Sequence, residues 1–141
     1  MLKFLLPVDG SDISNKAIAG FIKLLDYYKE VPELHFLNVQ FPQRGSVNRF
    51  IDKKSINLYH QEEGMKVLQG ARRSLDQAGI ACKLHITVGD PAEMIIRYAK
   101  EMECDQIIMG PRGLGTVKGL LLGSVTSRVM QLSTTPVLLI K

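Results

Sequence analysis

The chain has 141 residues, a mass of 15.7 kDa and a formal net charge of +4, with 45% apolar and 23% charged residues. This length predicts one domain over residues 1–141, and the composition excludes a disordered chain. The apolar runs are far shorter than the ~20 residues that cross a bilayer, and the first residues lack a signal-peptide core. We therefore expect a cytoplasmic protein with no membrane partner.

The positive charge is spread along the chain. The basic doublets are Lys53 with Lys54 and Arg72 with Arg73, no basic run alternates with aromatic residues, and Trp is absent. A nucleic-acid interface usually concentrates such residues, so we expect no nucleic-acid partner.

The cysteine and histidine residues show no spacing typical of a metal site. Cys82 and Cys104 are 22 positions apart and form no Cys-x-x-Cys pair, which predicts two reduced, buried thiols. His35, His60 and His85 are isolated in the sequence, and each is interpreted as a packing or surface residue.

Strand and helix patterns alternate along the chain. Strands are expected over 2–8, 33–39, 80–88, 105–109 and 137–140, and helices over 14–29, 58–78, 91–103 and 124–133, with a polar loop over 41–54. Asp90, Pro91 and Glu93 form a helix start with a capping box, and Gly79 is expected as the C-cap of the long helix. Five strands separated by helices predict an α/β layered fold with a mainly parallel sheet.

The connection over 110–122 is the most informative segment. It has 13 residues, whereas a strand-to-helix loop usually has about 2–6. The glycines in and directly after it are Gly110, Gly113, Gly115, Gly119 and Gly123. Ser124 and Thr126 add hydroxyl donors at the start of the next helix, whose first N–H groups favour an anion, and Arg112 and Lys118 add positive charge. These features predict a phosphate cradle, or alternatively a surface loop with turn glycines and a serine N-cap.

Standard phosphate-binding signatures are absent. A Walker A loop needs Lys directly before Ser or Thr, but Lys118 precedes Gly119. The dinucleotide fingerprint needs Gly-x-Gly-x-x-Gly after the first strand, where this chain reads Asp9-Gly10-Ser11-Asp12. These absences argue against kinases, P-loop enzymes and dehydrogenases.

Three motifs resemble the universal stress protein family. Gly110-x-x-Gly113, nine residues and then Gly123-Ser124 is similar to its nucleotide-binding signature. The opening Pro7-Val8-Asp9-Gly10-Ser11 and the closing Thr135-Pro136-Val137-Leu138-Leu139-Ile140 resemble its two ends. The resemblance spans the whole chain and implies a Rossmann-like, five-stranded parallel sheet in order 3-2-1-4-5 with helices on both faces. The first and fourth strands then end at the point where strand order reverses, where open sheets bind ligands.

The resemblance also implies an ATP site, because an intact glycine signature is similar to that of the family's ATP-binding branch. The adenosine would be flanked by Pro7, Val8 and Asp9, and the adenine would meet the backbone of Val39. The ribose and the phosphates would be lined by Met109, Gly110 and Gly113. The phosphates would also be held by Gly123, Ser124, Val125 and Thr126, with Arg112 as an additional contact. Mg²⁺ would bridge the phosphates without a carboxylate cluster to hold it.

Two segments depart from the family pattern. Pro111 removes one backbone donor from the loop and is expected to tune the affinity rather than abolish binding. Residues 40–56 cannot be matched to the family, and their role stays open.

The resemblance implies a cytoplasmic stress-response protein that acts as a nucleotide-dependent switch or sensor, with the glycine loop ordering on ATP. We expect little ATP hydrolysis, because Asp9 is interpreted as an acceptor for adenosine or a cap rather than as a base. The alternative is a dimeric interaction module that binds no nucleotide. An adenylating enzyme is disfavoured, because Ser-Gly-Gly-x-Asp-Ser and His-x-Gly-His motifs are absent.

The last strand is apolar at each position. Such a strand at a sheet edge is a template for pairing, and the resemblance implies a homodimer through it. The residues of this expected interface are Val137, Leu138, Leu139 and Ile140. The alternative is a strand covered by helices, and any other protein partner is unknown.

Overall fold

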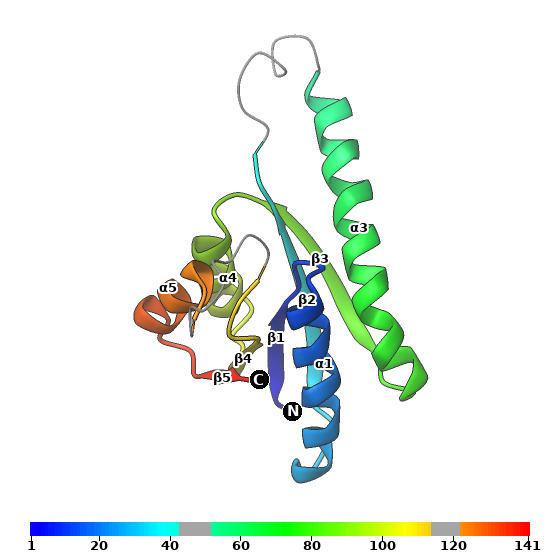
Figure 1. The fold of residues 1–141 in the computed structure, drawn as a ribbon, viewed down its shortest axis with the longest axis vertical. Coiled ribbons are helices and arrows are strands. Elements are labelled where there is room, and N and C mark those ends of the chain that lie inside the picture. Colours follow the sequence, from blue (N-terminus) through cyan, green and yellow to red (C-terminus); the bar gives the residue numbers. More distant parts are fainter. Residues whose placement is uncertain (43–51, 114–121) are drawn as a thin grey trace.

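A five-stranded parallel sheet forms the centre of the molecule (Figure 1), and the computed structural model describes residues 1–42, 52–113 and 122–141. The strands are β1 (Lys3–Pro7), β2 (Glu33–Gln40), β3 (Cys82–Val88), β4 (Gln106–Met109) and β5 (Val137–Leu139). Their order is β3-β2-β1-β4-β5, and each neighbouring pair is parallel. The predicted fold class and strand order are confirmed.

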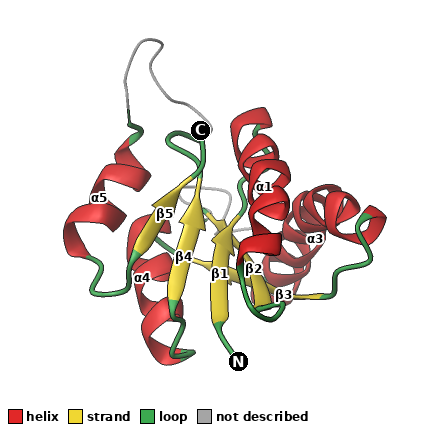
Figure 2. Cartoon of the chain, turned by 90° about the horizontal axis from the view of Figure 1, so that it is seen from below, coloured by secondary structure: helices red, strands yellow, loops and turns green. Residues whose placement is uncertain are grey.

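Helices cover both faces of the sheet (Figure 2). On one side lie α1 (Asp12–Leu24), continued by the 3₁₀ turn η1 (Leu25–Tyr27), and α3 (Lys53–Gln77). On the other side lie α4 (Pro91–Glu101) and α5 (Ser124–Leu132). Among the residues described, no helix is both long enough and apolar enough to span a membrane.

Alternate strand residues fill two separate cores, because successive side chains point to opposite faces of a sheet. Phe4 and Phe36 pack with Phe21 of α1 and Leu68 of α3. Their neighbours on the opposite face include Leu5, Leu37 and Ile107, which pack with Ile95 and Val129. Burial on both faces explains why the strands read as nearly continuous apolar runs.

The predicted element boundaries needed several corrections. Each strand end lies within two residues of its prediction, and α4 and α5 end slightly early. The α-helical part of α1 ends at Leu24 rather than at 29, and η1 follows it. Helix α3 begins at Lys53 rather than at 58, because the Asp52 carboxylate accepts the Ser55 N–H at 2.7 Å. The predicted loop therefore ends at residue 52, and its part over 43–51 lies outside the described residues.

Caps and thiols also differ in detail from the predictions. The C-cap of α3 is Ala78, and Gly79 follows it in the left-handed conformation (φ 71°). Asp90 accepts the Glu93 N–H at 3.1 Å, which is one half of the expected capping box. The prediction of two buried thiols holds for Cys104 but not for Cys82, which is only partly buried.

The order of the strands positions the site. Strand β1 leads into α1 on one face, whereas its neighbour β4 leads through the glycine-rich connection toward α5 on the other face. The two connections therefore diverge at the carboxyl ends of β1 and β4, which leaves room there for a ligand.

Candidate functional site

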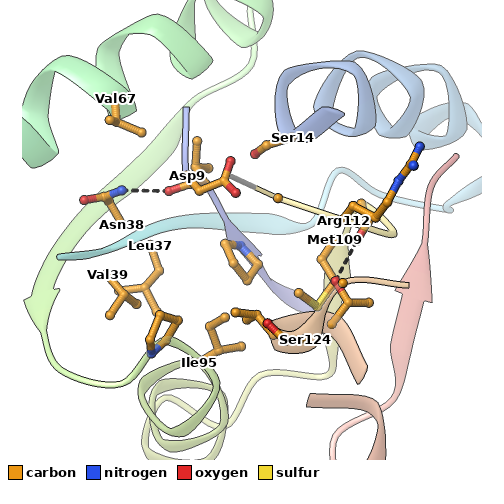
Figure 3. Close-up of a pocket in the computed structure, with 18 of the residues that line it drawn as sticks. Asp9, Ser14, Leu37, Asn38, Val39, Val67, Ile95, Met109, Arg112 and Ser124 are labelled. Atoms are coloured by element: carbon orange, nitrogen blue, oxygen red, sulfur yellow. Dashed lines mark hydrogen bonds between the residues drawn. The ribbon is translucent and has the colours of Figure 1, made fainter. Parts of the chain in front are cut away.

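A pocket of about 270 Å³ opens at the carboxyl ends of β1, β2 and β4 (Figure 3). The structure places all twelve predicted site residues in its lining. They are Pro7, Val8, Asp9, Val39, Met109, Gly110, Arg112, Gly113, Gly123, Ser124, Val125 and Thr126. Segments that are far apart in the sequence thus meet at one place, and the part that each residue plays in ligand binding stays a prediction.

One end of the pocket is apolar and is built by β2 and α4. Leu37 and Val39 lie on the same face of β2 and approach Ile95 of α4 (Figure 3). The Leu37 carbonyl accepts the Val8 N–H at 2.8 Å, so alternate residues of β2 turn their backbone groups toward β1. Since β1 ends at Pro7, the Val39 N–H and carbonyl face the pocket beyond that end. This edge offers one donor and one acceptor to a flat, polar-edged group.

The opposite end of the pocket is the N-terminus of α5. Ser11, Asp52 and Asp90 provide side-chain caps for α1, α3 and α4, whereas α5 begins at Gly123 without one. Among the α-helices of the described residues, the one without a side-chain cap is therefore the one that starts in the pocket. Its first N–H groups have no intrahelical partner, and they and the helix dipole favour an anion.

The hydroxyl groups of α5 are not equivalent. Thr126 is 3% exposed, and its hydroxyl donates to the Gly110 carbonyl at 3.1 Å. This bond braces the start of α5 against the end of β4 and uses the Thr126 hydroxyl proton within the protein, and the predicted contact of Thr126 with a ligand stays a prediction. Ser124 lies in the pocket wall, where its side chain faces the cavity (Figure 3).

Asp9 and Gly113 meet where the end of β1 approaches the glycine-rich connection. The Ser11 N–H donates to Asp9 Oδ1 at 2.9 Å, which fixes the carboxylate. A Cβ atom on Gly113 would overlap Asp9 Oδ2. Glycine is therefore required at position 113 for this close approach, which brings the opening motif and the glycine signature together.

Arg112 lines the pocket, and its guanidinium group extends outward from the pocket in Figure 3. Its side chain lies on the side away from Val39 (Figure 3), and its buried Nε has no hydrogen-bond partner among the described residues. The predicted contributions of Gly115, Lys118 and Gly119 lie outside the described residues. Pro111 has a structural role, because its carbonyl accepts the Gly123 N–H at 2.8 Å.

The sequence and the fold match known proteins. The family model described as the Universal stress protein family matches residues 1–141. This chain belongs to the universal stress protein family. One similar relative is the Universal stress protein YxiE of Bacillus subtilis, 33% identical over 99% of this chain and 98% of that protein. The resemblance predicted from the sequence is confirmed, and the chain is a stress-response protein of that family.

Two solved structures support the assignment. The structure of protein MJ0577 has a TM-score of 0.81 and 30% identity, covering 99% of this chain and 95% of that one. A universal stress protein solved in complex with cAMP has a TM-score of 0.67 and 26% identity, with the same two coverages. The pocket of the present protein lies at the carboxyl ends of the parallel strands, where open α/β sheets generally bind ligands.

Several pocket residues of this universal stress protein were not predicted. They are Ser14, Leu37, Asn38, Gln40, Phe41, Val67, Pro91 and Ile95. Asn38 could have been found, because it is a polar residue between the apolar Leu37 and Val39 near the end of a predicted buried strand. Its Nδ2 donates to the Val8 carbonyl at 2.8 Å, and Gln40 Nε2 donates to Asn38 Oδ1 at 2.6 Å. This network joins the end of β1 to β2 at the edge of the pocket.

A second polar cluster lies on β2 and β3 and corrects the view of the histidines as isolated. His35 Nδ1 and His85 Nε2 share a hydrogen bond of 2.8 Å, and His35 Nε2 bonds Glu33 Oε1 at 2.6 Å. The parallel register, which pairs His35 with Lys83, brings these side chains together. The hydrogen bond from His35, and then that from Lys83, lowers the pKa of Glu33. Burial, followed by the charges of His35 and Lys83, lowers the pKa of His85.

Proposed function

We propose that this universal stress protein binds ATP in the pocket and acts as a nucleotide-dependent switch or sensor. The observation that carries the proposal is the uncapped N-terminus of α5, which opens into a pocket whose other end is apolar. A nucleotide has the same polarity, with a base at one end and phosphates at the other. The solved universal stress protein with cAMP supports an adenine nucleotide as the ligand class.

Each end of the pocket has a defined part in this proposal. The adenine lies against Leu37, Val39 and Ile95, and the Val39 backbone meets its polar edge. The phosphates lie at the first N–H groups of α5, where Ser124 adds a hydroxyl donor. Arg112 supplies a positive charge on the same side. Mg²⁺, when present, would be held mainly by the phosphates, because Asp9 is the single carboxylate among the described lining residues.

We further propose that hydrolysis is slow. Phosphoryl transfer needs a positioned base or water in line with the leaving group. Asp9 accepts the Ser11 N–H and lies against Gly113, so it is held as an acceptor at the end of β1. Turnover is expected below the usual enzyme range of ~1–1000 per second.

Calorimetric titration with ATP and Mg²⁺ tests the binding site, and Gly113→Ala is the diagnostic variant. Its Cβ overlaps Asp9 Oδ2, so the carboxylate or the loop must move. We expect the wild type to bind ATP and the variant to bind at least ~10-fold more weakly, which corresponds to about 1.4 kcal/mol. Gly70→Ala is the matched control, because a Cβ there meets nothing within 4 Å and Gly70 does not line the pocket.

The outcomes separate the two candidate functions. Equal ATP affinity in the wild type, Gly113→Ala and Gly70→Ala would show that ATP does not bind at the Asp9–Gly113 contact. A folded wild type that does not bind ATP would favour the alternative, an interaction module without a nucleotide.

For both functions we propose a homodimer through β5, which lies at the edge of the sheet next to β4.

A further inference from the structure

The hydroxyl of Ser14 has no hydrogen-bond partner among the described residues, although Ser14 is only 7% exposed. Ser14 lines the pocket from the first turn of α1. Figure 3 shows it beside Asp9, with its oxygen turned toward that carboxylate. Buried hydroxyls usually have a partner, so an orphaned one at a pocket wall indicates a ligand group that completes its bonding.

Folding alone does not explain a serine at this position. The Ser14 N–H is already bonded to the Ser11 hydroxyl at 3.1 Å, and this bond does not involve the Ser14 side chain. Alanine is a better helix former than serine and would leave no unsatisfied oxygen. The hydroxyl is therefore a feature of the pocket rather than of the helix.

The position of Ser14 indicates which part of a nucleotide it meets. Asp9 and Ser14 lie together on one side of the pocket, opposite both Val39 and Ser124 (Figure 3). A nucleotide with its base at Val39 and its phosphates at Ser124 turns its middle group, the ribose, toward that side. The Asp9 carboxylate repels phosphate and only accepts hydrogen bonds, and the ribose diol offers two O–H donors side by side.

We propose that Ser14 and Asp9 together bind the ribose diol, and that Ser14 makes the pocket selective for ribonucleotides over deoxyribonucleotides. The inference rests on the proposed function, because it assigns a further contact in the same ATP site. Ser14 takes one hydroxyl of the diol and Asp9 takes the other. A site built to bond a hydroxyl rejects the analogue that lacks it, because its own polar group is then left unpaired.

Titration of wild type and Ser14→Ala with ATP, 2′-deoxyATP and 3′-deoxyATP tests the proposal. The wild type should bind each deoxy analogue about 10-fold more weakly than ATP. In Ser14→Ala, ATP affinity should fall about 10-fold, and discrimination against one of the two analogues should fall below about twofold. The two effects coincide because the variant and that analogue remove the two ends of one hydrogen bond.

The melting temperature without nucleotide distinguishes a binding role from a structural one. Ser14→Ala should melt at or above the wild-type temperature, because it removes an unsatisfied buried hydroxyl. Ser11→Ala is the matched control: it removes the cap of α1 and should melt lower, yet keep the wild-type selectivity, because Ser11 does not line the pocket.

Two results would overturn the inference while leaving the proposed function intact. One is a wild type that binds ATP and both deoxy analogues equally. The other is a Ser14→Ala variant that keeps full discrimination against both analogues. A wild type that binds none of the three nucleotides would overturn the proposed function and this inference with it.

Discussion

Two glycines of α3 provide a direct test of how closely this helix packs on the sheet. A Cβ on Gly64 would lie 2.8 Å from Ile86 Cγ2 and 3.0 Å from Cγ1 and Cδ1. A Cβ on Gly70 would meet nothing within 4 Å. Both residues lie in the interior of the same helix, so Gly64→Ala and Gly70→Ala make the same chemical change in opposite surroundings.

The expected free energies of unfolding follow from two opposing effects. Replacing glycine with alanine inside a helix stabilises by about 0.5–1 kcal/mol, and Gly70→Ala should show this gain in full. At Gly64 the same gain is offset by overpacking, which costs about 1–3 kcal/mol. Ile86 cannot relieve the contact by rotating its end, because Cγ2 and Cγ1 are both attached directly to its Cβ. Gly64→Ala should therefore range from about neutral to about 2.5 kcal/mol destabilising.

Urea denaturation of the two variants and the wild type measures the difference. Gly70→Ala should also raise the melting temperature by ~2–5 °C for a chain of this size. If Gly64→Ala is as stabilising as Gly70→Ala, then Ile86 moves aside freely and the close approach of α3 to β3 is wrong. The distance matters for the site because α3 contributes Val67 to the pocket wall.

Two further predictions concern pH and assembly. The pKa of His85 lies below its usual 6.5 in the folded protein. As the pH falls past 6.5, the unfolded chain therefore binds more protons than the folded one. The stability that neutral His85 contributes is present above pH 6.5 and is lost as the pH falls through the folded pKa. Urea denaturation between pH 7 and 5 should show this loss in the wild type and a weaker one in His85→Gln, and parallel profiles would contradict it. For a dimer through β5, light scattering at micromolar concentration should give twice the chain mass of 15.7 kDa, and a mass of one chain would refute it.

The elements and motifs that depend on local chemistry could be predicted from the sequence. Strands were found because burial on both faces gives short apolar runs, as in β1 and β4. The glycine signature was found because Gly110, Gly113 and Gly123 have fixed spacing along a single segment. All twelve candidate residues, which were assigned through the resemblance to the family, lie near strand ends or helix starts and line one pocket.

The features that were missed depend on how separate elements pack. The start of α3 was placed too late because its first turns are polar, and only the Asp52 cap marks it. The pairing of His35 with His85 depends on the register between β2 and β3, to which no local pattern points. The same holds for Val67, which reaches the pocket through the packing of α3 on the sheet.

Buried polar groups without a partner among the described residues occur at the proposed ligand site, on Ser14 and Arg112, and outside it, on His60 of α3. The first N–H groups of α5 lack a side-chain cap, and the Ser14 hydroxyl and the Arg112 Nε lack partners among the described residues. Each such group destabilises the free protein. The other α-helices begin with side-chain caps from Ser11, Asp52 and Asp90, which satisfy N–H groups of the first turn without a ligand. A ligand that supplies the missing partners binds the folded state alone, and at 100 times its Kd it stabilises that state by about 2.7 kcal/mol. This coupling between stability and occupancy is what a nucleotide-dependent switch requires.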